Sequence, residues 1–222
     1  MKRCTAILFL VCGVALGLHA QDYRFAIGAG AGISGYLGDV NTSNIFRKIG
    51  FSAGAIFRYN INNRFAVKAM SNVVSLSGDS KYEKNVFPGG EHYAFKSTVI
   101  DAAAQFEFNF LNYGIGSKYL KLKRISPYLA LGLGANCALC NGSSAFSFQI
   151  PMGFGVKFKL KERLNLGAEW SFSKVFGDHI DGLSDLNGIK SGFAKNKDWY
   201  STVTVSFTYE FSKRCKTCHY VD

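Results

Sequence analysis

Beyond its N-terminus, the sequence lacks any apolar run of the length that a membrane-spanning helix needs. The one apolar run extends from about Ala6 to Leu18, after the charged Lys2 and Arg3, and small Ala20 follows it. This order is typical of a secretory signal peptide, and the run itself is too short to cross a membrane as a helix. We therefore predict a signal peptide over residues 1–20, followed by one exported domain of ordinary size.

Acidic residues are scarce, with 15 Asp and Glu against 26 Lys and Arg, which gives a formal net charge of +11. Such a balance can indicate nucleic-acid binding. Here the basic residues are scattered at the ends of predicted strands and in loops, and only the stretch 118–124 approaches a cluster. Because the chain is expected to be exported, we predict no nucleic-acid partner. The basic residues are expected to form a solvated rim or to face lipid phosphates.

Cysteines are few once a signal peptide is removed, and they form two CxxC pairs, Cys137 with Cys140 and Cys215 with Cys218. The separation of the two pairs along the chain is far from that of a zinc ribbon. In an oxidising compartment each pair is expected either to close on itself as a disulfide or to stay idle. We predict no metal site and no cofactor.

Histidines are also rare, and His92, His179 and His219 all fall in predicted loops or the tail. A barrel hydrolase or lipid-modifying enzyme would need a histidine beside a serine nucleophile, with a carboxylate to orient it. Nothing in the spacing of Asp178, His179 and Ser184 requires such a triad. We predict no enzymatic activity and no small-molecule substrate.

What the sequence does contain is apolar alternation with a period of two, which is the pattern of a β-strand with one apolar face. The clearest run covers residues 199–211, where valines and aromatic residues alternate with threonines, serines and one glutamate. Such runs are long for soluble strands and suit tilted membrane strands. Eight segments are predicted as strands: 23–37, 49–60, 64–78, 94–110, 127–139, 145–160, 164–176 and 199–211.

The side chains opposite the large apolar residues decide between two kinds of barrel. A soluble lipocalin-like barrel needs bulky apolar groups inside, whereas here the opposite set is small, polar or charged. The narrow lumen of a small membrane barrel holds such side chains, while the apolar set meets lipid. We therefore predict an all-β fold, an eight-stranded antiparallel transmembrane β-barrel of the outer membrane. A charge network is expected to fill the lumen and exclude a wide pore: Arg58, Arg64, Lys68, Asp101, Glu107 and Glu169.

The connections between the predicted strands alternate in length, as in barrels with short periplasmic turns and long external loops. Short turns are predicted at 61–63 and 161–162, and long loops at 38–48, 79–93 and 177–198. The exceptions are a longer connection at 111–126 on the short-turn side and a tight turn at 141–144 on the other. An aromatic girdle is expected at the short-turn side: Phe25, Tyr59, Phe65, Phe110, Tyr128, Phe158 and Phe211. With an even strand number both termini are periplasmic, and we assign 21–212 to the barrel and 213–222 to a periplasmic tail.

Several stretches, taken in order, resemble the small outer-membrane barrels typified by PorG, a component of the type IX secretion system. They are residues 36–41, 58–66, 127–134 and 178–184, followed by Asp198, Trp199 and Tyr200. The resemblance covers nearly all of the mature chain. It implies a barrel without catalytic activity that contacts outer-membrane lipid and the periplasmic ring of the lipoprotein PorK and its partner PorN.

The largest basic elements on the predicted periplasmic side are expected to form the partner surface. They are the connection 111–126 and the tail, with Lys118, Lys121, Lys123, Arg124, Lys213 and Arg214. The alternative is a free-standing surface barrel of the OmpA or OmpX kind, in which loops 79–93 and 177–198 bind an external ligand.

Overall fold

The alternating segments of the sequence form eight strands in the computed structural model, which describes residues 23–37, 48–79, 94–115, 121–140, 143–176 and 199–211. No helix in this part of the chain is long and apolar enough to cross a membrane. The strands are β1 (Phe25–Leu37), β2 (Gly50–Asn60), β3 (Phe65–Asp79), β4 (Ala94–Asn109), β5 (Ile125–Cys140), β6 (Ser143–Lys159), β7 (Leu164–Val175) and β8 (Trp199–Phe211).

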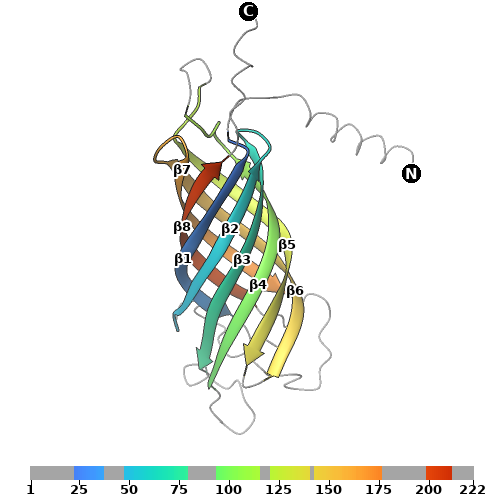
Figure 1. The fold of residues 1–222 in the computed structure, drawn as a ribbon. Helices are drawn as coiled ribbons and strands as arrows, with labels where there is room; N and C mark the ends of the chain where they lie inside the picture. Colours follow the sequence, from blue (N-terminus) through green and yellow to red (C-terminus); the bar gives the residue numbers. More distant parts are fainter. Residues whose placement is uncertain are drawn as a thin grey trace, which may run out of the picture.

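Each strand pairs antiparallel with the next one along the chain, and β8 pairs with β1 to close a barrel (Figure 1). The closing register runs from Phe25 opposite Phe211 to Leu37 opposite Trp199. Closure leaves no strand with unpaired backbone groups at a sheet edge, which is a condition for crossing lipid. The predicted eight-stranded antiparallel barrel is thus confirmed.

The strand limits differ from the predicted ones by a few residues. One such difference lies between β5 and β6, where Ser143 and Ser144 were expected in a turn but instead belong to β6. They continue the ladder opposite Cys140 and Leu139. Serine has no large apolar side chain to mark a period, so alternation alone did not reveal this extension.

The polarity of the two faces of the sheet is the reverse of that in a soluble barrel. Along β4, Asp101, Gln105 and Glu107 are buried inside the barrel, whereas Ile100 and Phe106 on the other face are about half exposed, at 46% and 49%. Successive residues of a strand point to opposite faces, so this pattern places polar groups in the lumen and apolar groups outside. An apolar outer face of this kind is what a lipid surrounding stabilises.

Both short turns lie at one end of the barrel, together with the start of β1 and the end of β8 (Figure 1). We call this the short-turn end and the opposite one the long-loop end. Aromatic rings cluster at the short-turn end, where Phe25 contacts Phe57, Tyr59 and Phe211 with ring centroids 5.3–6.0 Å apart. Tyr128 does not belong to this girdle, because its side chain points into the lumen and is only 2% exposed.

Candidate functional site

The lumen is organised around Glu107 of β4, whose side chain is fully buried among three cations. Arg58 donates from Nε to Oε2 at 2.8 Å and from Nη2 to Oε1 at 3.3 Å. Lys157 Nζ lies 2.5 Å from Oε2, and Lys68 Nζ lies 3.5 Å from Oε1. A buried carboxylate is tolerated only with such partners, since an unpaired charge in a dry interior is costly.

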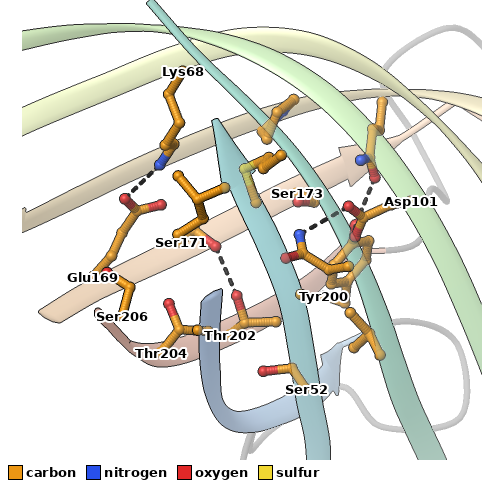
Figure 2. Close-up of a pocket in the computed structure, with 18 of the residues that line it drawn as sticks. Ser52, Lys68, Asp101, Glu169, Ser171, Ser173, Tyr200, Thr202, Thr204 and Ser206 are labelled. Atoms are coloured by element: carbon orange, nitrogen blue, oxygen red, sulfur yellow. Dashed lines mark hydrogen bonds and ion pairs between the residues drawn. The ribbon is translucent and has the colours of Figure 1, made fainter. Parts of the chain in front are cut away.

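The second carboxylate of this network is Glu169, which approaches from β7 on the far side of the barrel. Its Oε2 lies 2.6 Å from Lys68 Nζ, and Figure 2 shows the two side chains meeting in the lumen. The Tyr128 hydroxyl donates to the same oxygen at 2.5 Å. The Tyr128 ring also lies under Lys157, with Nζ 4.4 Å from the ring centroid. Ion pairs and one aromatic ring therefore fill the lumen at this height.

A second charged layer lies nearer the short-turn end. Lys159 Nζ is 2.7 Å from Glu210 Oε2, and Asn165 donates to Glu210 Oε1 at 3.0 Å. Tyr113, from the connection between β4 and β5, donates its hydroxyl proton to Asn165 Oδ1 at 2.7 Å. Lys159 Nζ lies 5.4 Å from the centroid of the Tyr113 ring. The connection thus covers the mouth of the lumen with an aromatic side chain.

Toward the long-loop end the lumen becomes less polar. The Tyr200 hydroxyl lies 2.9 Å from Asp101 Oδ2 and 2.6 Å from Gln149 Oε1, and Asn72 donates to Asp101 Oδ1 at 2.9 Å (Figure 2). Beyond this layer comes a buried apolar cluster that includes Tyr36, Val74, Leu76, Val99, Ala138 and Val175. A polar layer and an apolar layer therefore close the barrel above the ion pairs.

Between the ion pairs and the polar layer around Tyr200 lies a small cavity lined by hydroxyl groups. They include those of Ser171 and Thr202, which hydrogen-bond to each other at 2.7 Å (Figure 2). The volume of the cavity is about 30 Å³. A water molecule needs roughly 10–15 Å³ of such space, so the cavity has room for about two or three waters. Among the described residues, ion pairs lie on one side of this cavity and the buried apolar cluster lies on the other.

The structure brings together four of the six residues predicted for the charge network: Arg58, Lys68, Glu107 and Glu169. Asp101 also lies in the lumen, but its partners are Tyr200 and Asn72 rather than a cation. The expectation for Arg64 was wrong. It lies in the turn before β3, is exposed, and donates from Nε to Asn112 Oδ1 at 2.8 Å.

Sequence reasoning missed several members of the lumen: Lys157, Lys159, Glu210, Tyr128 and Tyr113. The first four lie on strand positions of the polar alternating set, so the alternation of inward and outward side chains was enough to predict them. Tyr113 lies in an irregular connection, where no period shows which way a side chain points.

Exposed cations dominate the short-turn end. We call them the basic collar: Arg24, Arg64, Lys121, Lys123, Arg124, Lys161 and Arg163. Glu162 is the one exposed carboxylate of the described residues at this end. Of the predicted partner surface, Lys121, Lys123 and Arg124 belong to the collar, whereas Lys118, Lys213 and Arg214 lie outside the described residues.

The described residues of the connection between β4 and β5, 110–115 and 121–124, are held in place by backbone hydrogen bonds. Lys123 donates its N–H to Asn112 O at 2.7 Å, and Gly114 donates to Lys123 O at 3.0 Å. Tyr113 N–H donates to Asn63 O at 3.1 Å, which ties the connection to the neighbouring turn. These backbone hydrogen bonds hold Lys123 beside the mouth of the lumen.

Arg163 of the turn between β6 and β7 has a different environment from the rest of the collar. Its Nε donates to the Tyr23 hydroxyl at 3.2 Å, and its Nη1 donates to the Tyr209 hydroxyl at 3.1 Å. The guanidinium carbon also lies 5.0 Å from the centre of the Tyr23 ring. The hydrogen bonds to Tyr209 and Tyr23 raise the pKa of the Arg163 guanidinium above its ordinary value. The group is therefore a permanent cation.

The cysteine pair in β5 does not form the disulfide that the CxxC spacing allowed. Cys137 is free, and the strand continues as far as Cys140. Residues three apart in a strand are separated by roughly 10 Å, beyond the reach of a disulfide. Cys215 and Cys218 lie outside the described residues. The described part of the chain contains no group of three or more His, Cys, Asp or Glu side chains placed to hold a metal ion.

A closed antiparallel barrel with an apolar outer face and a charged, filled lumen defines a small outer-membrane β-barrel. Its fold resembles that of Neisserial surface protein A, with a TM-score of 0.53 and 14% identity over 84% of this chain and 97% of that one. It also resembles Ail, the attachment invasion locus protein of Yersinia pestis, solved in complex with the heparin analogue sucrose octasulfate. Here the TM-score is 0.50 and the identity 14%, over 86% of this chain and 99% of Ail.

The chain belongs to the family described as "Domain of unknown function (DUF6089)", whose model matches residues 2–220. The comparison with curated proteins found no match.

Proposed function

We propose that this protein is a non-enzymatic outer-membrane anchor that assists the periplasmic ring of a type IX secretion machine. The observation that carries the proposal is the filled lumen, with the basic collar at its short-turn end. Ion pairs centred on Glu107 fill the barrel, and Tyr113 covers its mouth at the short-turn end. A barrel whose described lumen is occupied by paired charges and apolar side chains is expected to act through its surfaces. The basic collar is the most strongly charged of its described surfaces.

The orientation follows from the lengths of the connections. Small outer-membrane barrels have short turns in the periplasm and long loops outside. The turns at 61–64 and 160–163 therefore belong on the periplasmic side, together with the basic collar. Both chain ends lead into the same compartment in this arrangement. The collar then faces the compartment in which a ring of the PorK and PorN type would lie.

The partner surface is the connection between β4 and β5. Lys121, Lys123 and Arg124 are exposed there, and backbone hydrogen bonds hold Tyr113, Gly114 and Lys123 in place. Ordered cations favour association with an acidic protein surface, because little conformational entropy is lost on binding. Lys118 extends this basic sequence by three residues.

Deletion of the gene is the experiment that tests the role directly. Loss of proteins that carry type IX signals from the medium, restored by the wild-type gene, is the expected result. Heat-modifiable gel migration of the restored protein shows that the barrel is folded. Normal secretion in the deletion strain would contradict the role, and it would favour a free-standing surface barrel whose long loops bind an external ligand.

Single charge reversals test the partner surface. Lys121→Glu in the connection should reduce co-purification of the ring, and the quadruple reversal of Lys118, Lys121, Lys123 and Arg124 should reduce it further. Lys161→Glu is the matched control, since Lys161 is equally exposed at the same end but lies in the turn between β6 and β7. Equal recovery with Lys121→Glu, Lys161→Glu and the quadruple variant would remove the connection from consideration.

A further inference from the structure

Arg163, Tyr23 and Tyr209 form a cluster of hydrogen-bond donors, and several of their protons have no acceptor among the described residues. Each tyrosine oxygen accepts a hydrogen bond from Arg163, at 3.2 Å and 3.1 Å, so each hydroxyl keeps its own proton for donation. Within the described part of the chain, Arg163 Nη2 has no acceptor. Donors from three side chains, one guanidinium and two phenol hydroxyls, therefore converge at one end of the barrel.

No carboxylate of the described residues forms an ion pair with this cluster. Glu162 precedes Arg163 in the same turn, yet the partners of Arg163 are the two neutral hydroxyls. The surrounding collar adds further cations, which raise the local concentration of anions. The chemistry of the cluster thus fits a small anionic group with several acceptor oxygens.

The cluster lies where the polar end of the barrel meets its apolar wall. Tyr209 is on the outer face of β8, 42% exposed, and pairs with Ile27 of β1 and Leu164 of β7. Beside it, Phe211 stacks on Phe25 with ring centroids 6.0 Å apart. In membrane barrels such an aromatic girdle marks the depth of the lipid headgroups. The donors therefore face sideways, at the level of the lipid phosphates.

We propose that Arg163, Tyr23 and Tyr209 bind the phosphate of an anionic glycerophospholipid beside the seam where β7, β8 and β1 meet. The planar guanidinium offers its outer edge to two phosphate oxygens, and the tyrosine hydroxyls donate to the remaining ones. The acyl chains of the lipid lie along the apolar side chains of β8 and β1. The site is independent of a role in secretion, because it uses the lateral wall of the barrel rather than the connection over its mouth.

The test uses the full mature barrel, reconstituted in nanodiscs of mixed phosphatidylglycerol and phosphatidylcholine. The protein is then released into mild detergent, and native mass spectrometry counts the lipids that remain bound. Wild-type protein should retain phosphatidylglycerol in excess over phosphatidylcholine. Arg163→Gln should reduce this excess by about fivefold, the effect of losing one charge-assisted phosphate contact at an exposed site.

Two matched control variants distinguish specific lipid binding by this cluster from attraction by the net charge of the collar. Arg64→Gln removes an equally exposed arginine of the collar, whose partner is the amide of Asn112, and should leave retention unchanged. Tyr209→Phe should lower retention, whereas Tyr59→Phe in the same girdle should not. Heat-modifiable migration confirms the fold of every variant.

Four results would overturn the proposal. Retention that is unchanged in Arg163→Gln would remove the site, and an equal loss in Arg64→Gln would assign retention to the net charge of the collar. Displacement of the lipid by inorganic phosphate at millimolar concentration would identify a free-anion site instead. Weakened recovery of a periplasmic protein with unchanged lipid retention would make Arg163 a protein contact.

Discussion

The Nζ atom of Lys68 on β3 lies 2.6 Å from Oε2 of Glu169 on β7, so a single ion pair spans the barrel between opposite strands. Three of the other buried ion pairs in the described residues also join strands that are not neighbours in the sheet. They are Arg58 with Glu107, Lys157 with Glu107, and Lys159 with Glu210. We call these ion pairs cross-braces, because they connect strands that are not hydrogen-bonded to each other through their backbones.

Removal of the Glu107 carboxylate should destabilise the barrel strongly. Glu107→Gln leaves Arg58, Lys157 and Lys68 facing one another around a neutral amide. Breaking a buried pair in this way costs about 3 kcal/mol of unfolding free energy. Urea unfolding of the refolded barrel in lipid vesicles, followed by tryptophan fluorescence, measures the change.

Asp101→Asn is the control for that measurement. Asp101 is also buried in the lumen, but hydrogen bonds from Asn72 and Tyr200 are its contacts rather than an ion pair. Its loss should cost about 1 kcal/mol. Equal effects of the two variants would show that the cations around Glu107 do not stabilise the fold.

The purified protein should give no stable conductance steps in a planar lipid bilayer. Ion pairs fill the middle of the lumen, and an apolar cluster around Val74 and Leu76 closes the long-loop end. Tyr113→Ala should also give no conductance steps, because this change removes only the side chain at the mouth of the lumen. A reproducible open channel from the wild-type protein would contradict the closed lumen.

Two glycines of β1 should differ sharply in their tolerance of a methyl group. A Cβ atom at Gly32 would lie 1.9 Å from the backbone oxygen of Val203, whereas at Gly30 the nearest atom is Ser206 Cβ at 3.3 Å. Gly32→Ala should therefore destabilise the barrel by about 2 kcal/mol, as overpacking does, and Gly30→Ala by much less. Urea midpoints of the two variants test this, and equal midpoints would count against the close approach of β1 to β8.

Cys137 and Cys140 should both be found as thiols. The strand keeps the two residues too far apart for a disulfide, and Cys137 is free. Alkylation under denaturing, non-reducing conditions followed by peptide mass spectrometry should detect two alkylated cysteines in the peptide from β5. A mass two hydrogens lower without alkylation would mean that this end of β5 is not extended.

Much of the fold could be predicted because apolar and polar residues alternate along each strand and so mark its two faces. Along β4 the alternation of Ile100 and Phe106 with Asp101 and Glu107 showed both the strand and its orientation. Two side chains were misplaced because the alternation of inward and outward positions was not used for one of them and does not extend to the other. Tyr128 shares the parity of the lumen set but was grouped by its aromatic ring, and Arg64 lies just before β3 begins.

The partners within the lumen could not be predicted in the same way. Whether Lys68 meets Glu107, Glu169 or both depends on how far the strands shift against one another when the sheet closes. That shift is a property of the whole barrel and cannot be predicted from the sequence of any single strand. The position of Tyr113 over the mouth likewise depends on contacts between the connection and Asn165 of β7.

The cross-braces also constrain the order in which the barrel can assemble. A hairpin of neighbouring strands cannot form the pairs between Lys68 and Glu169 or between Lys159 and Glu210, because the members of each pair lie on strands that are not neighbours. Until β8 meets β1, these charges need water on the inner side of the open sheet. Expulsion of that water and neutralisation of the charges then occur together, which makes the last step of insertion a cooperative one.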